Sequence, residues 1–583
     1  MQVKVPVIIK DPEVAEYKDL PFWEYFTIEE DIFLDGPISR RVAILDFDES
    51  GVLQKGTDFQ PSENNNSFGR YAYPDLDVKS EESFKNWDFL RAAIFGGVYK
   101  ALSMFEESDT LGRKVRWAFA GPQLLVIPRA GEWANAFYER DSRSLQLFYV
   151  SGNGKKTYAC HSQDIIGHET AHAIIDGVAP DLYDAITPES LAIHEALADI
   201  TTVLLAFRSR KLASRVLEMT NGSIESSSAF TRVAEQFAGA ISQGRHDFLR
   251  NLKNEFTMQS INIDLKEPHS LSQVLSGALY SIAVRLHEEL KKEAVQRNTL
   301  SKFVVQSEVE RLKGELDPDE ISYFSSYSPG KALFLTGERL KRMIMRGLDY
   351  IPPGDASFVD FGCAMLAADA ASHPESSSQR DWLAEEFEKR KIIESRKEIE
   401  PIINVDEKPL SGLNLSELLE SDWVAYQFVN RHRGWLGIPS RIPFEVRPRL
   451  LVKKRYYHRD DKVEDVEELI MKIIWTETEK MSSGASLPSS RRIRRGVSLV
   501  FDFNSKRVRA LLCTKPSEKQ QKNRDEFVRL LADSDILRIG EAAKGPSGNL
   551  LRACVSADIT DKALRVKNTA RMLHIISEYE NER

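Results

Sequence analysis

Residues 163–177 read Gln-Asp-Ile-Ile-Gly-His-Glu-Thr-Ala-His-Ala-Ile-Ile-Asp-Gly, and this stretch decides how the chain around it is interpreted. It contains no proline, Ser162 can cap its start, and its final glycine stands where a helix commonly ends, so we expect a helix. His168 and His172 are four residues apart and project from one face of that helix, with Glu169 between them. This His-Glu-x-x-His spacing is typical of helices that bind one zinc ion through both histidines.

A catalytic zinc ion takes three protein ligands and keeps one position open, so a third ligand is needed downstream. Glu195 is our choice, because the threonine-proline pair at 187–188 indicates the start of a second helix that would carry it. Asp199 follows one turn later on the same face and is spaced to accept the outer N–H of a bound histidine such as His168. Glu189 and His194 are rival candidates for the third ligand.

From residue 134 to residue 199, and more loosely to about residue 390, the sequence resembles the thermolysin-like gluzincin metallopeptidases. That family follows His-Glu-x-x-His with Glu-x-x-x-Asp on a second helix. The resemblance implies the following site residues: metal ligands His168, His172 and Glu195, general base Glu169, and Asp199 behind the ligands. It also implies an active-site tyrosine at Tyr183, a transition-state histidine at His269, and a substrate-binding edge strand at Asn135, Ala136 and Phe137.

The chain departs from the family pattern between Tyr183 and Glu195, where it is longer than thermolysin itself and has His194 in a position usually held by asparagine. The third ligand therefore stays open among these candidates. Considered without the family, Tyr183 can be a loop aromatic, His269 a helix cap and Asn135 a turn residue. The calcium-binding carboxylates of the family cannot be traced, so one catalytic zinc ion is expected and calcium is not.

The predicted fold class is α+β, with a thermolysin-like catalytic domain whose active-site helix lies between an antiparallel sheet lobe and a helical lobe, and with a separate C-terminal α+β domain. A chain of 583 residues is too long for one hydrophobic core. The predicted divisions are an N-terminal segment 1–80, a peptidase domain 81–396, a linker 397–415 and a C-terminal domain 416–583. Predicted strands lie at 115–119, 124–127, 135–138 and 145–150, and predicted helices lie at 84–105, 163–176, 277–293 and 331–349.

In the C-terminal part, the sequence predicts strands at 444–457, 497–503 and 507–513 and helices at 463–474 and 525–532. A serine-rich stretch at 482–490 indicates a loop. Two basic runs, 449–455 and 491–495, are interrupted by acidic stretches, so we expect a solvated surface rather than a nucleic-acid interface.

Composition narrows the class of protein. The net charge is −9, yet the part after residue 420 carries an excess of about ten basic residues, which suggests a partner-binding role for it. The four cysteines show no C-x-x-C pair, and we find neither an apolar run of 18 residues nor a secretory signal. We therefore expect a cytoplasmic protein that does not contact membranes.

Together these patterns predict a zinc-dependent endopeptidase that hydrolyses internal bonds of a protein or peptide through a metal-activated water, under regulation and with narrow specificity. Control would come from the narrow specificity itself, from an occluding loop, or from a protein partner held by the C-terminal domain. The alternative is a binding or regulatory protein whose zinc site is inactive or structural. A fourth protein ligand closing the metal site would favour that alternative.

Overall fold

The computed structural model describes residues 1–11, 20–62, 68–152, 155–226, 229–233, 250–297, 329–374, 378–400, 410, 412–457, 463–482, 487–515, 517–534, 536–539, 555–567 and 569–571. Helices and strands are both abundant, which confirms the predicted α+β class. The predicted linker at 397–415 and the serine-rich stretch at 482–490 lie partly outside the described residues.

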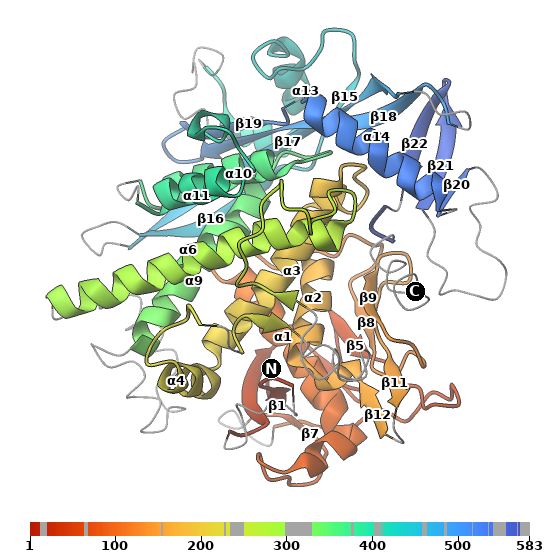
Figure 1. The fold of residues 1–583 in the computed structure, drawn as a ribbon, viewed down its shortest axis with the longest axis vertical. Helices are drawn as coiled ribbons and strands as arrows, with labels where there is room; N and C mark the ends of the chain where they lie inside the picture. The colour runs from red at the N-terminus through yellow and green to blue at the C-terminus, as the bar shows by residue number, and fades with distance from the viewer. Residues whose placement is uncertain are drawn as a thin grey trace.

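A six-stranded sheet lies beside two central helices, α2 (Gln163–Val178) and α3 (Pro188–Arg208), in Figure 1. Its strand order is β3-β4-β5-β8-β10-β9. Its strands are β3 (Phe33–Leu34), β4 (Ile38–Ser39), β5 (Val42–Ile44), β8 (Leu124–Ile127), β9 (Ala136–Glu139) and β10 (Ser144–Leu147). The prediction of an antiparallel lobe is wrong for β8, which runs parallel to both β5 and β10. Helix α1 (Trp87–Glu106) carries the chain back across the sheet between β5 and β8, as a parallel pairing requires.

The remaining strands of the first 300 residues that the structure describes form two-stranded pairs. They are β1 (Gln2–Ile8) with β2 (Trp23–Glu29), β6 (Phe59–Gln60) with β7 (Arg70–Tyr71), β11 (Tyr149–Gly152) with β12 (Lys155–Tyr158), and β13 (Arg232–Val233) with β14 (Arg250–Asn251). The predicted strand 115–119 is absent from the described structure. Its backbone bonds to side chains instead, because Val115 donates its N–H to Glu106 and accepts from Arg41.

The helical part packs against the same two central helices. They are α2 (Gln163–Val178) and α3 (Pro188–Arg208), with the six-stranded sheet on one side and α6 and α9 on the other (Figure 1). The surrounding helices are α4 (Arg210–Met219), α6 (Pro268–Arg297), α9 (Pro329–Tyr350), α10 (Phe358–Ser372) and α11 (Ser378–Lys389). Short 3-10 turns are η2 (Glu81–Lys85), η3 (Ala159–His161), η4 (Pro180–Leu182) and η5 (Arg396–Glu398). The predicted helices at 163–176, 277–293 and 331–349 are confirmed.

An eight-stranded sheet dominates the C-terminal part and lies above the helices in Figure 1. Its strands are β15 (Phe444–Val446), β16 (Leu450–Tyr457), β17 (Val463–Lys480), β18 (Ser490–Asp502), β19 (Val508–Cys513), β20 (Leu537–Ile539), β21 (Val555–Thr560) and β22 (Ala563–Lys567). The accompanying helices are α12 (Leu415–Glu420), α13 (Asp422–Arg431), α14 (Glu518–Asp533) and the turn η8 (Thr569–Arg571).

The predicted helix at 463–474 is wrong, because this segment begins the long strand β17. Strand β17 pairs with β18 over residues 468–480 and with β15 and β16 on its other edge, so it is a central strand. Leu469 and Met471 belong to one hydrophobic cluster and Ile470 to another. Burial on both faces hides the alternation of a strand and leaves apolar residues at a helix-like spacing.

The predicted solvated surface for the basic runs is also wrong in part. Lys454 and Arg491 have no exposed surface, and Arg495 is nearly buried. Lys454 pairs with Asp349, and Arg491 pairs with Asp525. Lys454 and Arg491 thus join the C-terminal sheet to α9 and α14 through buried ion pairs.

The largest hydrophobic cluster is a single set of buried residues whose members range in sequence from Val3 to Ala570. It includes Val452, Ile470 and Val500 of the C-terminal sheet. A second cluster holds α12 and α13 against the far face of β17 and β18. The C-terminal region therefore shares a core with the helices of the predicted peptidase domain. The division into domains stays a prediction.

Candidate metal centre

Helix α2 starts where the sequence predicts, because the Ser162 side chain accepts the N–H of Ile165 at 3.3 Å. It ends at Val178, one residue beyond the glycine expected to stop it. Gly177 serves packing instead: a Cβ there would lie 2.2 Å from the carbonyl oxygen of Arg116. The glycine thus allows α2 to pack closely against the loop before β8.

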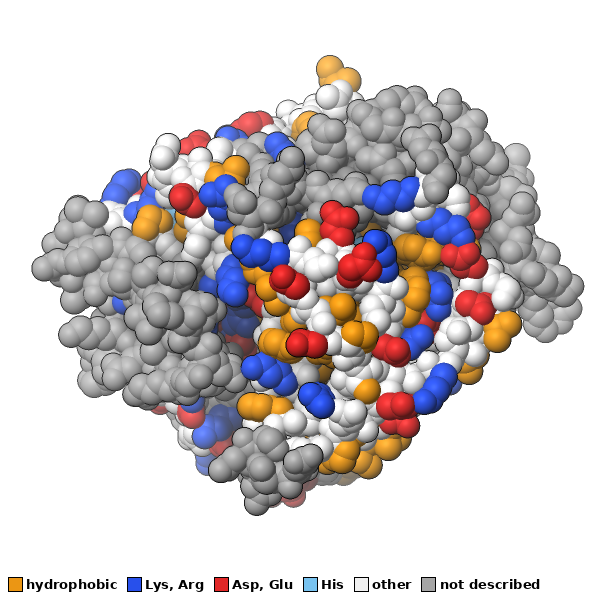
Figure 2. Space-filling view, turned by 90° about the horizontal axis from the view of Figure 1, so that it is seen from below, with side chains coloured by type: hydrophobic (Ala, Val, Ile, Leu, Met, Phe, Trp, Pro, Cys, Tyr) orange, Lys and Arg blue, Asp and Glu red, His pale blue; other side chains and the backbone are white. Residues whose placement is uncertain are grey.

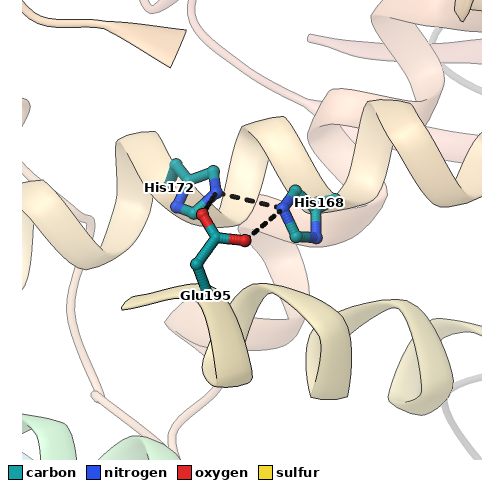
Figure 3. Close-up of side chains that lie close together, drawn as sticks. All are labelled: His168, His172 and Glu195. Atoms are coloured by element: carbon teal, nitrogen blue, oxygen red, sulfur yellow. Dashed lines mark hydrogen bonds and ion pairs between the residues drawn. The ribbon is translucent and has the colours of Figure 1, made fainter. Parts of the chain in front are cut away.

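Three side chains converge between α2 and α3, as Figure 3 shows: His168 and His172 from α2 and Glu195 from α3. The Nε2 atoms of the two histidines are 3.1 Å apart. Glu195 Oε1 lies 3.1 Å from His172 Nε2, and Oε2 lies 3.5 Å from His168 Nε2. All three side chains are buried.

The donor set fits a tetrahedral zinc ion. Ligand atoms that bind one such ion at 2.0–2.1 Å stand about 3.3 Å apart, close to the 3.1–3.5 Å found here, although the two histidines lie nearest to different oxygens of Glu195. Among the described residues, only His168, His172 and Glu195 form this group, so no fourth protein ligand closes it. An ion held by these three side chains would have no further protein ligand within the part of the chain that the structure describes, as in a catalytic site.

The rival ligands lie elsewhere. Glu189 is buried at the start of α3 and accepts the N–H of Phe358 at 2.8 Å, and burial raises its pKa. His194 does not face the cluster with its ring nitrogens; its Nδ1 lies 2.7 Å from Nδ1 of His172. With His172 Nε2 directed at the cluster, its Nδ1 carries the proton and donates to Nδ1 of a neutral His194.

Burial and charge set the protonation of these outer groups. Burial, reinforced by the neighbouring His172, holds the pKa of His194 well below its usual value, so the ring is neutral and can accept. Asp199 has no exposed surface, and its Oδ1 lies 3.1 Å from Nδ1 of His168, in the predicted place but oblique to the ring N–H. Burial disfavours a charged His168, yet Asp199 and Glu195 outweigh it and raise the pKa of His168 to about 10.

Glu169 connects α2 to the edge of the six-stranded sheet. Its Oε2 accepts the backbone N–H of Tyr138 in β9 at 3.0 Å. Burial raises the pKa of Glu169, although both histidines of the cluster oppose the shift. A buried carboxylate with a raised pKa beside a metal-ligand cluster is suited to accept and return a proton.

His269 reaches the cluster from the start of α6, and its Nε2 lies 3.5 Å from Oε2 of Glu195. Its Nδ1 lies 3.0 Å from Glu267. Burial opposes the charged ring, but Glu195 and Glu267 outweigh it and raise the pKa of His269. The side chain keeps 31% of its surface exposed, so it can meet a ligand that enters from solvent.

Arg250 is the site residue that sequence reasoning missed. From the short strand β14 its Nη1 lies 3.1 Å from Glu195 Oε2, and its Nη2 lies 3.4 Å from Nε2 of His168. Its Nε is 3.1 Å from Asp199. The contact with His168 uses the nitrogen that would bind an ion, so the guanidinium must withdraw from it when the site is filled. No motif surrounds Arg250, and only the need of a buried guanidinium for carboxylates could have indicated it.

The remaining predicted residues line the same region without joining the cluster. Ala136 begins β9, the last strand of the sheet, and Asn135 precedes it and accepts the N–H of Ala136 at 2.8 Å. Tyr183 is buried, with its ring 5.9 Å from that of Tyr138 and 6.2 Å from that of His194. Its hydroxyl has no hydrogen-bond partner among the described residues.

A second acidic group, Glu107, Asp109 and Glu338, also converges, but cations already hold it. Lys341 contacts all three carboxylates, and Arg208 bonds to Glu107 and Glu338. This is a buried ion-pair network rather than a place for a metal ion.

Comparison of the sequence with protein-family models and with curated proteins finds no match. Among the described helices, α3 alone is long and apolar enough to cross a membrane, and it is wholly buried, as a core helix would be. Figure 2 views the molecule from below and shows acidic and basic side chains interspersed over the part of that face not drawn in grey. That part of the face is not the continuous basic surface typical of nucleic-acid binding.

Proposed function

We propose that the chain is a zinc-dependent endopeptidase that hydrolyses internal bonds of a protein or peptide substrate. The observation that carries the proposal is the convergence of His168, His172 and Glu195 with Glu169 beside them. Zinc held by the three ligands would supply a Lewis acid that polarises the scissile carbonyl and lowers the pKa of water toward about 7.

The chain's own residues supply the proton transfers and the hydrogen bonds. Glu169 takes a proton from the attacking water and returns it to the departing amine, for which its raised pKa suits it. His269 and Arg250 donate hydrogen bonds to the oxygen that becomes negatively charged in the transition state. Tyr183 fits this role less well than Arg250, because its ring is buried while the guanidinium lies among the ligand atoms.

The open edge of β9 supplies the substrate-binding backbone in this proposal. Alternate residues of a strand direct their N–H and C=O groups to opposite edges. Tyr138 N–H bonds to Glu169 rather than to β10, so Ala136, two residues earlier, also directs its backbone away from the sheet. An extended peptide that donates to the carbonyl of Ala136, whose N–H is held by the Asn135 side chain, would place its next residues beside Glu169.

The test compares Glu169→Gln with the unaltered chain, using zinc analysis and cleavage of a quenched peptide library. Glu169→Gln should keep zinc and lose at least about 100-fold in turnover, because a positioned general base contributes that much or more. His168→Ala should lose both zinc and turnover. Glu189→Gln is the matched control: it alters a buried carboxylate outside the cluster, keeps an oxygen for Phe358, and should retain activity. Full activity of Glu169→Gln would overturn the mechanism.

Narrow specificity is part of the proposal, since a cytoplasmic endopeptidase that cleaved proteins at random would damage its own cell. The unaltered chain should therefore cleave few members of a diverse protein mixture, as measured by mass spectrometry of new termini. Rapid digestion of unrelated proteins would contradict this part and leave the metal chemistry intact.

A further inference from the structure

A cavity of about 160 Å³ lies between the end of the active-site helix and the C-terminal sheet. Its walls include Val178 and Leu182 after α2, Ile351 after α9, and Leu450 and Ile470 of the sheet. It is far larger than the space of one water molecule but smaller than the 300–1,000 Å³ typical of sites for drug-sized ligands. It therefore suits a small organic molecule with an apolar body.

Lys472 is the unusual residue of this cavity. It lies on β17 two residues after Ile470 and so shares its face, which packs against the helices. No hydrogen bond or ion pair joins its ammonium to another of the residues that the structure describes. Burial lowers the pKa of Lys472 to about 8, despite the opposing effect of Asp349. Lys472 is only partly exposed, so its ammonium is less well hydrated than at the surface, and an anion beside it would offset that loss.

The two carboxylates whose charges favour the ammonium of Lys472, Asp349 and Asp181, are already engaged. Asp349 bonds to both Nη atoms of Arg113, at 2.7 and 2.9 Å, and to Lys454 at 2.8 Å. Asp181, which lines the cavity, accepts from Arg494 at 2.9 Å and lies 3.4 Å from Arg447. The cavity thus keeps one positive charge without a partner among the described residues, together with apolar walls.

We propose that this cavity binds a small monocarboxylate with an apolar body, whose carboxylate pairs with the ammonium of Lys472. The carboxylate could belong to a free acid or to the C-terminus of a peptide that ends in a branched apolar residue. No residue of the metal centre lines the cavity, so the proposal does not depend on peptidase activity.

The probe is 4-methylpentanoate, with 4-methylpentanamide as the neutral molecule of the same shape. Isothermal titration of the full chain should show that the acid binds at least about tenfold more tightly than the amide, as a charge-assisted hydrogen bond implies. The acid should also slow acylation of Lys472 by an amine-reactive reagent, followed by peptide mass spectrometry. Lys480, exposed at the end of the same strand, should react at an unchanged rate.

Lys472→Met should weaken binding of the acid about tenfold or more and leave the fold at least as stable, because an unpaired amine is removed. Lys480→Met is the matched control and should bind normally. A leucine-terminated peptide with a free or an amidated C-terminus separates the two sources: tighter binding of the free form than of 4-methylpentanoate assigns a peptide terminus, and weaker binding assigns a free acid. Equal binding of acid and amide, no binding of either, or unchanged binding by Lys472→Met would overturn the proposal.

Discussion

Replacing Asp199 by asparagine measures how much the carboxylate behind the metal centre contributes to it. Asp199 is fully buried, and its Oδ1 lies 3.1 Å from both His168 Nδ1 and Arg250 Nε. Partners of this kind contribute 10- to 100-fold to metal affinity, because they fix the tautomer and orientation of the ligand. Since the carboxylate lies oblique to the ring N–H, we expect the lower end: zinc binding about tenfold weaker, or about 1.4 kcal/mol.

Zinc affinity is measured by competition with a chromophoric chelator, and circular dichroism checks that the variant is folded. Asp369→Asn is the matched control: it removes a buried carboxylate of α10 that pairs with Arg339 of α9 and Arg380 of α11, and this variant should bind zinc normally. If Asp199→Asn binds zinc as tightly as the unaltered chain, Asp199 does not orient His168. An equal loss in the control would attribute the effect to general destabilisation.

Three further predictions follow from the same region. His194→Ala should weaken zinc binding about tenfold, and His194→Asn, which restores an acceptor, should recover it in the same competition assay. Zinc affinity should strengthen as pH rises from 6 to 9, because the raised pKa of His168, about 10, means that binding must release its proton; titrations in buffers of different ionisation enthalpy count the protons released. Arg140→Met should lower the free energy of unfolding by about 3–5 kcal/mol, because it leaves the buried Asp176 unpaired, whereas the exposed Arg143→Met should change it by less than about 0.5 kcal/mol in urea denaturation.

The site could be predicted from sequence where local geometry decides it. His168 and His172 must share a face of any helix that contains them, and Ser162 caps that helix as expected. The placement of Glu195 and Asp199 beside them is found in the structure as expected. This placement could be predicted because the threonine-proline pair at 187–188 indicates the start of a second helix, and because the resembled family carries Glu-x-x-x-Asp on that helix. Their roles stay predictions until the variants are measured.

Features that depend on distant chain segments could not be predicted. Arg250 reaches the cluster from a two-residue strand. No residue near it in sequence predicts that its guanidinium contacts Glu195, Asp199 and His168. The segment 463–474 has the apolar spacing of a helix although it lies in strand β17. Both faces of this strand are buried, which removes the polar-apolar alternation that identifies a strand. In both cases the partner that decides the structure is far away in sequence.

The segment 183–187 between the two ligand-bearing helices is held by the C-terminal region, and this predicts what truncation does. The carbonyl of Tyr183 accepts from Ala570 N–H at 3.1 Å, and Asp355 accepts from Ile186 N–H and from the N–H of Arg494 in β18, each at 2.8 Å. Arg524 of α14 contacts Thr187, the cap residue of α3.

These contacts set how α3 lies against α2, and hence where Glu195 lies relative to His168 and His172. A chain ending before residue 416 would also expose the shared core, so we expect aggregation or weakened zinc binding rather than an independent peptidase domain. Expression of residues 1–415, with solubility, chelator competition and peptide cleavage as readouts, tests this. A soluble fragment with the zinc affinity of the full chain would show that the C-terminal contacts do not position the metal ligands.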